Sequence, residues 1–164
     1  IMRSSPRSAR QRRLREVTLV EEEASKLFEY ESNKTLLVSG AFLYWAEGDK
    51  TRGVSFTNSD SKMIAFMIKW LREICKVKNN NLEARLHIHN KENERNAINY
   101  WSKLTGIPDK QFRKSYIKAK GTGHRKNSLP NGIIRVRVCG TGSTDLRYKI
   151  LKWADLYYQE SIRP

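Results

Sequence analysis

Hydrophobic residues recur along the chain with two spacings, one typical of helices and one typical of strands. Helical spacing in the segments 14–31 and 61–76 predicts two amphipathic helices. The segment 36–46 is apolar all the way round, so we expect a helix that is buried on every side. Two further helices are expected at 93–105 and from Thr144 onward. The buried stripe of the last helix is expected to consist of Leu146, Ile150, Trp153 and Tyr157.

Strand spacing occurs between these helices. It predicts strands at 54–57, 82–89, 115–118 and 132–139. The strand at 82–89 is the clearest, because its apolar residues alternate strictly with Glu, Arg and His. The order of the elements predicts an α+β fold, with helices on one face of a mainly antiparallel sheet.

Length and composition limit the class of protein. The chain has 164 residues, of which 38% are hydrophobic and 30% charged, which suits one folded domain and excludes a disordered chain. No apolar run approaches the roughly 20 residues of a membrane-spanning helix, so we expect a cytoplasmic protein without a membrane partner. Cys75 and Cys139 are too few for a disulfide framework or a four-cysteine zinc site, and we expect both to be structural.

Charge is the strongest signal in the composition. The net charge is +15, and the pI is near 10. Residues 1–15 contain six Arg and no acid, whereas residues 16–31 contain six Glu and one Lys. The charges of these two segments nearly cancel, so most of the surplus positive charge lies from residue 32 onward. A folded body with this surplus repels itself, which favours a nucleic acid as partner and a location at the nucleoid over a basic surface kept for solubility.

The polar face of the predicted sheet is rich in Arg and His. Such a face suits duplex DNA, because Arg reads guanine edges while Ser, Thr and Lys contact phosphates. A second basic cluster lies in the Gly-rich segment after the third strand. The candidate DNA-binding residues are Arg52, Ser55, Thr57, Arg85, His87, His89, Lys118, Lys120, Arg125, Lys126, Arg135 and Arg137. An alternative use of His87 and His89, with His124, is a zinc site.

One motif resembles a known family. The segment Gly40–Gly48 reads Gly-Ala-Phe-Leu-Tyr-Trp-Ala-Glu-Gly, which resembles the signature helix of the LAGLIDADG homing endonucleases. The segments Phe56–Asp60, Arg85–His89 and Trp101–Pro108 extend the likeness, which covers roughly 35–158 and is greatest to small single-motif bacterial and archaeal members. The resemblance implies a saddle-shaped antiparallel sheet with helices on one face.

The resemblance also implies an activity. In this family two signature helices pack together at a twofold axis, so a chain with one motif is expected to act as a homodimer. Gly40, Ala41 and Tyr44 are then the residues of the helix that face the second copy. Glu47 is the candidate catalytic residue and metal ligand, and it would hold Mg²⁺ for cleavage of double-stranded DNA.

The resemblance divides the chain and leaves two alternatives open. The expected units are a flexible basic arm at 1–13, an amphipathic helix with a linker at 14–34, and the LAGLIDADG-like DNA-binding domain at 35–160. Trp45 stands where the family often has Asp, which favours a catalytically inactive DNA-binding regulator. An RNA-binding or splicing cofactor is the other alternative, because a basic saddle also suits structured RNA.

Overall fold

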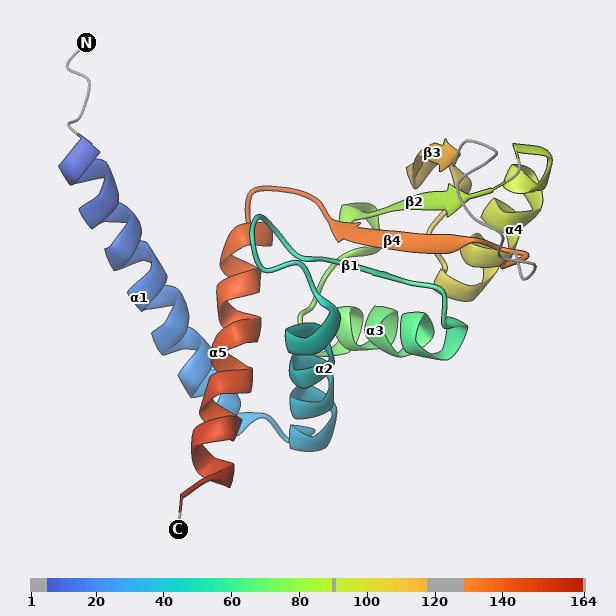
Figure 1. The fold of residues 1–164 in the computed structure, drawn as a ribbon. Coiled ribbons are helices and arrows are strands. Elements are labelled where there is room, and N and C mark those ends of the chain that lie inside the picture. Colours follow the sequence, from blue (N-terminus) through green and yellow to red (C-terminus); the bar gives the residue numbers. More distant parts are fainter. Residues whose placement is uncertain (1–5, 90, 118–128, 164) are drawn as a thin grey trace.

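The protein has an α+β fold, as the sequence predicts (Figure 1). A computed structural model describes residues 6–89, 91–117 and 129–163. Its helices are α1 (Pro6–Tyr30), α2 (Lys34–Glu47), α3 (Ser61–Glu73), α4 (Glu94–Thr105) and α5 (Ser143–Ser161). Its strands are β1 (Ser55–Asn58), β2 (Leu82–Ile88), β3 (Phe112–Ile117) and β4 (Ile133–Val138). Single 3-10 turns occur at Asn79–Asn81, Lys91–Asn93 and Asp109–Gln111.

The four strands form one mixed sheet in the order β1-β4-β2-β3. The strand β4 runs antiparallel to both β1 and β2, as predicted, whereas β3 runs parallel to β2 at the edge. The chain reaches β3 from β2 by way of α4, and such a crossover is what a parallel pair requires. The strand β3 also begins three residues before the predicted 115–118, because its alternation is interrupted by an irregularity in the register.

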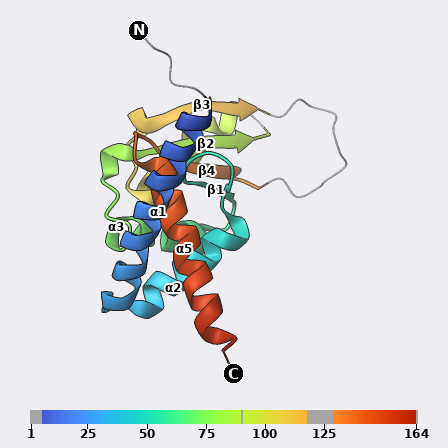
Figure 2. The same cartoon turned by 90° about the vertical axis from the view of Figure 1, so that its left-hand side faces the viewer.

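The hydrophobic core lies on one side of the sheet. The inward residues of β2 and β4, such as Leu86 and Val136, share this core with the apolar sides of the helices. Trp70 of α3 and Trp153 of α5 meet there edge-to-face, with ring centroids 6.3 Å apart. The helix α1 lies against α5 (Figure 2), and its buried Phe28 belongs to the same core. The other face of the sheet is left with exposed polar side chains.

The N-terminal helix is longer than predicted. The expected flexible arm at 1–13 is wrong from Pro6 onward, since α1 begins there. Proline suits the first turn of a helix, and the Arg residues that follow are good helix formers. Arg13 also donates hydrogen bonds to Glu16 at 3.1 Å and to Asp145 of α5 at 3.0 Å, which ties this part of α1 to the body.

The helix α2 is buried on one side only. Leu37 and Tyr44 are fully buried, but Trp45 is 47% exposed, so the prediction of a helix covered on every side is wrong. The reason is that α2 packs mainly against α5, α3 and β1, which leaves one side of the helix exposed. Tyr157 of α5, predicted to be buried, lies 38% exposed beside this surface. No helix in the described ranges has both the length and the apolarity to cross a membrane.

Candidate nucleic-acid interface

Arginine side chains from neighbouring strands lie side by side on the outer face of the sheet. In the register, Arg85 of β2 stands opposite Arg113 of β3 on one side and opposite Arg135 of β4 on the other. Arg135 in turn stands opposite Thr57 of β1. Three guanidinium groups thus form a row across three strands, although like charges directly opposite one another destabilise a sheet.

A second row lies two residues further along the strands. There Arg137 of β4 stands between Glu83 of β2 and Ser55 of β1. We call the outer side chains of both rows, together with Arg52 from the loop before β1, the basic face. Its arginines are Arg52, Arg85, Arg113, Arg135 and Arg137.

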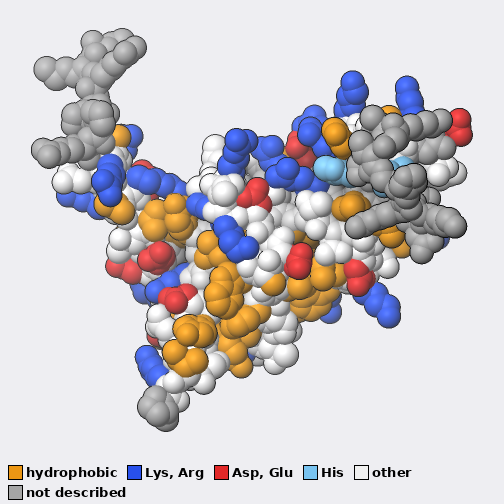
Figure 3. Space-filling view, viewed as in Figure 1, with side chains coloured by type: hydrophobic (Ala, Val, Ile, Leu, Met, Phe, Trp, Pro, Cys, Tyr) orange, Lys and Arg blue, Asp and Glu red, His pale blue; other side chains and the backbone are white. Residues whose placement is uncertain are grey.

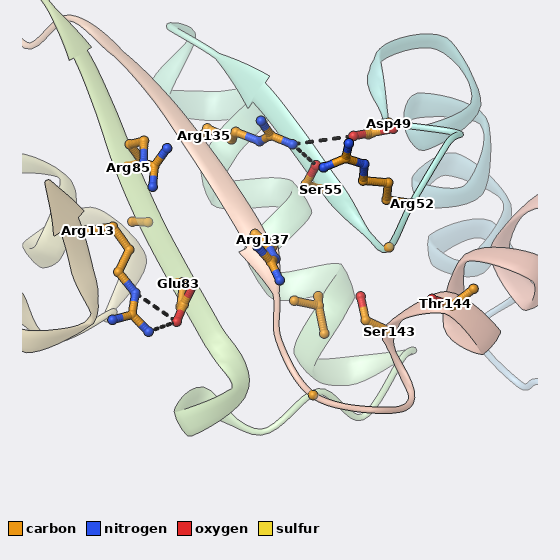
Figure 4. A pocket seen from close by; sticks show the side chains of 14 residues that line it. Asp49, Arg52, Ser55, Glu83, Arg85, Arg113, Arg135, Arg137, Ser143 and Thr144 are labelled. Carbon is orange, nitrogen blue, oxygen red and sulfur yellow. Dashed lines mark hydrogen bonds and ion pairs between the residues drawn. The ribbon is translucent and has the colours of Figure 1, made fainter. Parts of the chain in front are cut away.

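The basic face borders a hollow of about 480 Å³ between the sheet and the first turn of α5 (Figure 4). All five arginines line it, and the opposing carboxylates in its lining are those of Asp49 and Glu83. Ser143 and Thr144 close the hollow at the end of α5. Figure 3 shows the same concentration of Lys and Arg along the strands. The arrangement is a concave cationic surface.

Two of the arginines are paired with acids. Arg113 donates through Nε to Glu83 at 2.9 Å, and this contact lowers the pKa of the Glu83 carboxyl. Arg135 donates through Nη2 to Asp49 at 3.3 Å and to the Ser55 hydroxyl at 3.1 Å. Both acids remain ionised at neutral pH, so each cancels part of the charge of one arginine.

The other three arginine side chains are unpaired. Arg52, Arg85 and Arg137 make no side-chain hydrogen bond or ion pair within residues 6–89, 91–117 and 129–163, and all three are exposed. Their charges are therefore available to an external anion.

The loop between α2 and β1 is held in place from below. Tyr44 donates its hydroxyl to the carbonyl of Asp49, and burial raises the pKa of this phenol to about 12. Asp49 accepts hydrogen bonds from the amide of Thr51 at 2.8 Å and its hydroxyl at 2.7 Å, which lower the pKa of the carboxyl. Arg147 of α5, buried at 8% exposure, donates to the carbonyl of Lys50. Arg52 is thus presented from a supported loop.

Glu47 ends α2 next to the basic face. It is exposed and lines a smaller hollow of about 280 Å³ together with Asp49, Thr57 and Arg135. The two hollows share Asp49, Ser55 and Arg135, so they adjoin. The Glu47 carboxylate has no hydrogen bond or ion pair within the described part of the chain. It is therefore free to bind a cation.

The described residues contain no cluster of three or more His, Cys, Asp or Glu side chains that protein ligands alone could use to hold a metal. His87 is half-buried beside Tyr116, His89 follows β2 and is exposed, and His124 lies outside the described residues. Cys75 and Cys139 are both free, and burial raises the pKa of each thiol, to about 11 for Cys139. Both thiols therefore stay protonated at neutral pH.

Comparison with known proteins gives no family for this chain. Family models, curated proteins and solved structures contain no match.

Most of the predicted DNA-binding residues that the structure describes are exposed at the basic face, but not all of them. Arg52, Thr57, Arg85, His89, Arg135 and Arg137 are exposed at or beside the basic face. Ser55 is only 3% exposed, because Arg135 lies over it, so its hydroxyl orients that arginine and is not a surface contact. His87 is half-buried on the same face of β2, beside Tyr116. The last four predicted residues, Lys118, Lys120, Arg125 and Lys126, lie outside the described residues.

The residues expected to face a second copy are buried in their own chain. A Cβ added to Gly40 would lie 2.2 Å from atoms of the Trp70 ring, and Ala41 and Tyr44 are 0% exposed. These three residues therefore leave no surface for a partner helix. The exposed side of α2 carries Trp45 instead, whose ring centroid is 6.4 Å from that of Tyr158.

Sequence reasoning missed two residues of this surface. Arg113 and Tyr116 stand on the outer face of β3 beside Arg85 and His87, respectively. Their strand was predicted to start at residue 115, which excluded Arg113. The sequence Phe-Arg-Lys-Ser-Tyr-Ile at 112–117 shows no regular alternation, because one extra residue interrupts it.

Proposed function

We propose that the chain binds double-stranded DNA through the basic face. One observation carries the proposal: five arginines converge on one concave surface, against two carboxylates. Adjacent strands place such side chains about 5 Å apart and alternate residues about 7 Å apart. A duplex carries one negative charge per roughly 1.7 Å of its axis, so it can neutralise a row of this density. A polyanion would thereby relieve the repulsion between Arg85 and its two arginine neighbours.

Salt dependence tests this proposal. The affinity for duplex DNA is expected to fall steeply with salt, with a slope of about −0.9 per neutralised phosphate. Arg137→Gln should reduce the magnitude of that slope by about one, because the contact between this arginine and one phosphate is lost. Fluorescence anisotropy between low and moderate salt measures both quantities.

Lys69→Gln is the matched control, since it removes the same charge from an exposed position on α3, on the core side of the sheet. Equal slopes for Arg137→Gln and the control would contradict the proposal. Tighter binding of a structured RNA than of the duplex would favour the RNA-binding alternative.

A DNA endonuclease of the LAGLIDADG type is the second candidate, and the position of Glu47 favours it. This unpaired carboxylate ends an apolar helix at the edge of the basic face. Mg²⁺ in such sites is commonly held by one or two carboxylates together with water and substrate phosphates. Glu47 fits that role, whereas Asp49 is engaged by Thr51 and Arg135. When bound, Mg²⁺ would supply Lewis-acid activation of water and stabilise the leaving oxygen.

The endonuclease candidate requires two copies of Glu47, and hence a homodimer. The surface available to a second copy is the exposed side of α2 and α5, where Phe42 contacts Trp45 and Tyr157 edge-to-face with centroids 5.6 Å apart. Hydrophobic side chains gather over this region in Figure 3. Light scattering with and without DNA measures the mass of the protein. A protein that stays monomeric on DNA would contradict the endonuclease candidate and favour the inactive DNA-binding regulator.

Replacement of Glu47 separates the endonuclease from the inactive regulator. Glu47→Gln is expected to bind duplex DNA slightly more tightly, by roughly twofold, because a negative charge beside the basic face is removed. Under the endonuclease candidate, the same variant loses cleavage of a plasmid library in Mg²⁺, and Ca²⁺ does not support cleavage by the original protein. Uncut DNA with the original protein in Mg²⁺, despite tight binding, would favour the regulator.

A further inference from the structure

The basic face ends in a pair of aromatic rings. Tyr116 of β3 stands directly opposite His87 of β2, and their ring centroids are 5.6 Å apart with planes tilted by 45°. Tyr116 is 61% exposed, although tyrosine is a large and partly apolar side chain. Arg85 lies two residues before His87, which is about 7 Å along the strand on the same face. An exposed aromatic surface thus adjoins the row of arginines.

An irregularity in the strand pairing places Tyr116 on this face. Arg85 pairs with Arg113, so a regular register would put Ser115 opposite His87; the observed partner is Tyr116. One extra residue in β3 therefore turns Tyr116 outward and Ser115 inward.

The inward position of Ser115 is costly. Its side chain is 8% exposed, and its hydroxyl finds no hydrogen-bond partner in the described part of the chain. A buried hydroxyl without a partner destabilises a fold. At this bulge a polar hydroxyl is buried without a partner while an aromatic ring is exposed. Stability alone would favour the opposite arrangement.

We propose that Tyr116 and His87 form a stacking site for a nucleobase that has left the stack of the bound DNA. This inference rests on the proposed DNA binding by the basic face. Aromatic rings beside arginines are how proteins bind unstacked bases, because every base offers a π-face while the arginines contact the adjacent phosphates. A fully paired duplex offers no such base to the rings. The site therefore favours DNA in which one base is unpaired or flipped out.

Three duplexes of identical length test the stacking site. The first is fully paired, the second carries one extrahelical adenine, and the third carries an extrahelical abasic residue at the same place. The protein is expected to bind the second roughly fivefold or more tightly than the third, since these two differ only in the base. Tyr116→Ala should abolish this difference, and Tyr116→Phe should keep it because the ring remains.

Tyr30→Ala is the control, because Tyr30 is 83% exposed at the end of α1, away from the sheet (Figure 1). Thermal unfolding checks that each variant is folded. As a second measurement, Tyr116→Trp should show fluorescence quenching with the extrahelical adenine and none with the abasic residue.

Equal affinity of the original protein for the adenine and abasic duplexes would overturn the stacking site. A preference that persists in Tyr116→Ala would overturn it too, leaving the rings as a cross-strand pair that stabilises the sheet. Failure of the proposed DNA binding gives a different result: Arg137→Gln would then leave the affinity for all three duplexes unchanged. With DNA binding intact, Arg137→Gln weakens all three and preserves the preference for adenine.

Discussion

Replacing both Arg85 and Arg137 with Gln is expected to weaken binding of duplex DNA roughly 30-fold or more. Each is exposed on the outer face of the sheet and unpaired in the described residues, and loss of one such contact typically costs about 1–3 kcal/mol. Arg113 and Arg135 contribute less, because Glu83 and Asp49 already neutralise part of their charge. Equilibrium binding at fixed ionic strength measures the loss.

The double replacement Lys69→Gln and Lys103→Gln is the matched control. Both lysines are exposed on helices that pack on the other side of the sheet, and the change in net charge is the same. If this control loses as much affinity as the arginine variant, the attraction comes from net charge alone. The basic face would then have no special role.

Without DNA, the same two arginines are expected to affect stability differently. Arg85 stands between two arginines, so Arg85→Gln should raise the free energy of unfolding without DNA by about 0.5–1 kcal/mol. Arg137 stands opposite Glu83 and helps to lower the pKa of that carboxyl, so its replacement brings no such gain. Urea unfolding measures both free energies, provided that the dependence of the free energy on urea concentration is the same in both variants. A higher free energy of unfolding in Arg85→Gln would show that Arg85 lowers the stability of the free protein. That result is expected for a residue that is retained because it binds a partner.

The strands show how far sequence patterns determine this surface. In β2 the alternation is strict from Leu82 to Ile88, and both its buried face and its outward Arg85 were predicted correctly. In β3 the pattern fails, because the extra residue changes which side chains face outward and only the pairing with β2 reveals it. Local alternation thus defines a face only where the register is regular.

Positions that depend on contacts between distant segments could not be predicted. Ser55 has the spacing of an outward residue, yet Arg135, 80 positions later, covers it. The all-apolar composition of α2 suggested burial on every side, but composition cannot show how many elements pack around a helix. The position of Glu47 beside the basic face depends on Arg135 of β4, and it was expected only through the family resemblance, because no local pattern places it there.

Replacing Gly40 with Ala is expected to lower the free energy of unfolding by about 2–3 kcal/mol. Within a helix this change normally stabilises by about 1 kcal/mol, because glycine is a poor helix former. Here the added Cβ would lie 2.2 Å from the Trp70 ring, which must move. That ring cannot move easily, since it is fully buried and donates its Nε1–H to the carbonyl of Leu37 at 3.2 Å. Overpacking of this kind typically costs 1–3 kcal/mol and occasionally more.

Ser39→Ala on the same helix supplies the control. Ser39 is exposed, so the same new residue should leave stability unchanged or raise it by a few tenths of a kcal/mol. Urea unfolding and the oligomeric state should be measured together for both variants. A lower stability of Gly40→Ala at unchanged mass places Gly40 against Trp70 within one chain. Unchanged stability with a loss of dimer would instead place Gly40 at a contact between two copies, as the resemblance to LAGLIDADG helices implied, and the packing of α2 on α3 would have to be different.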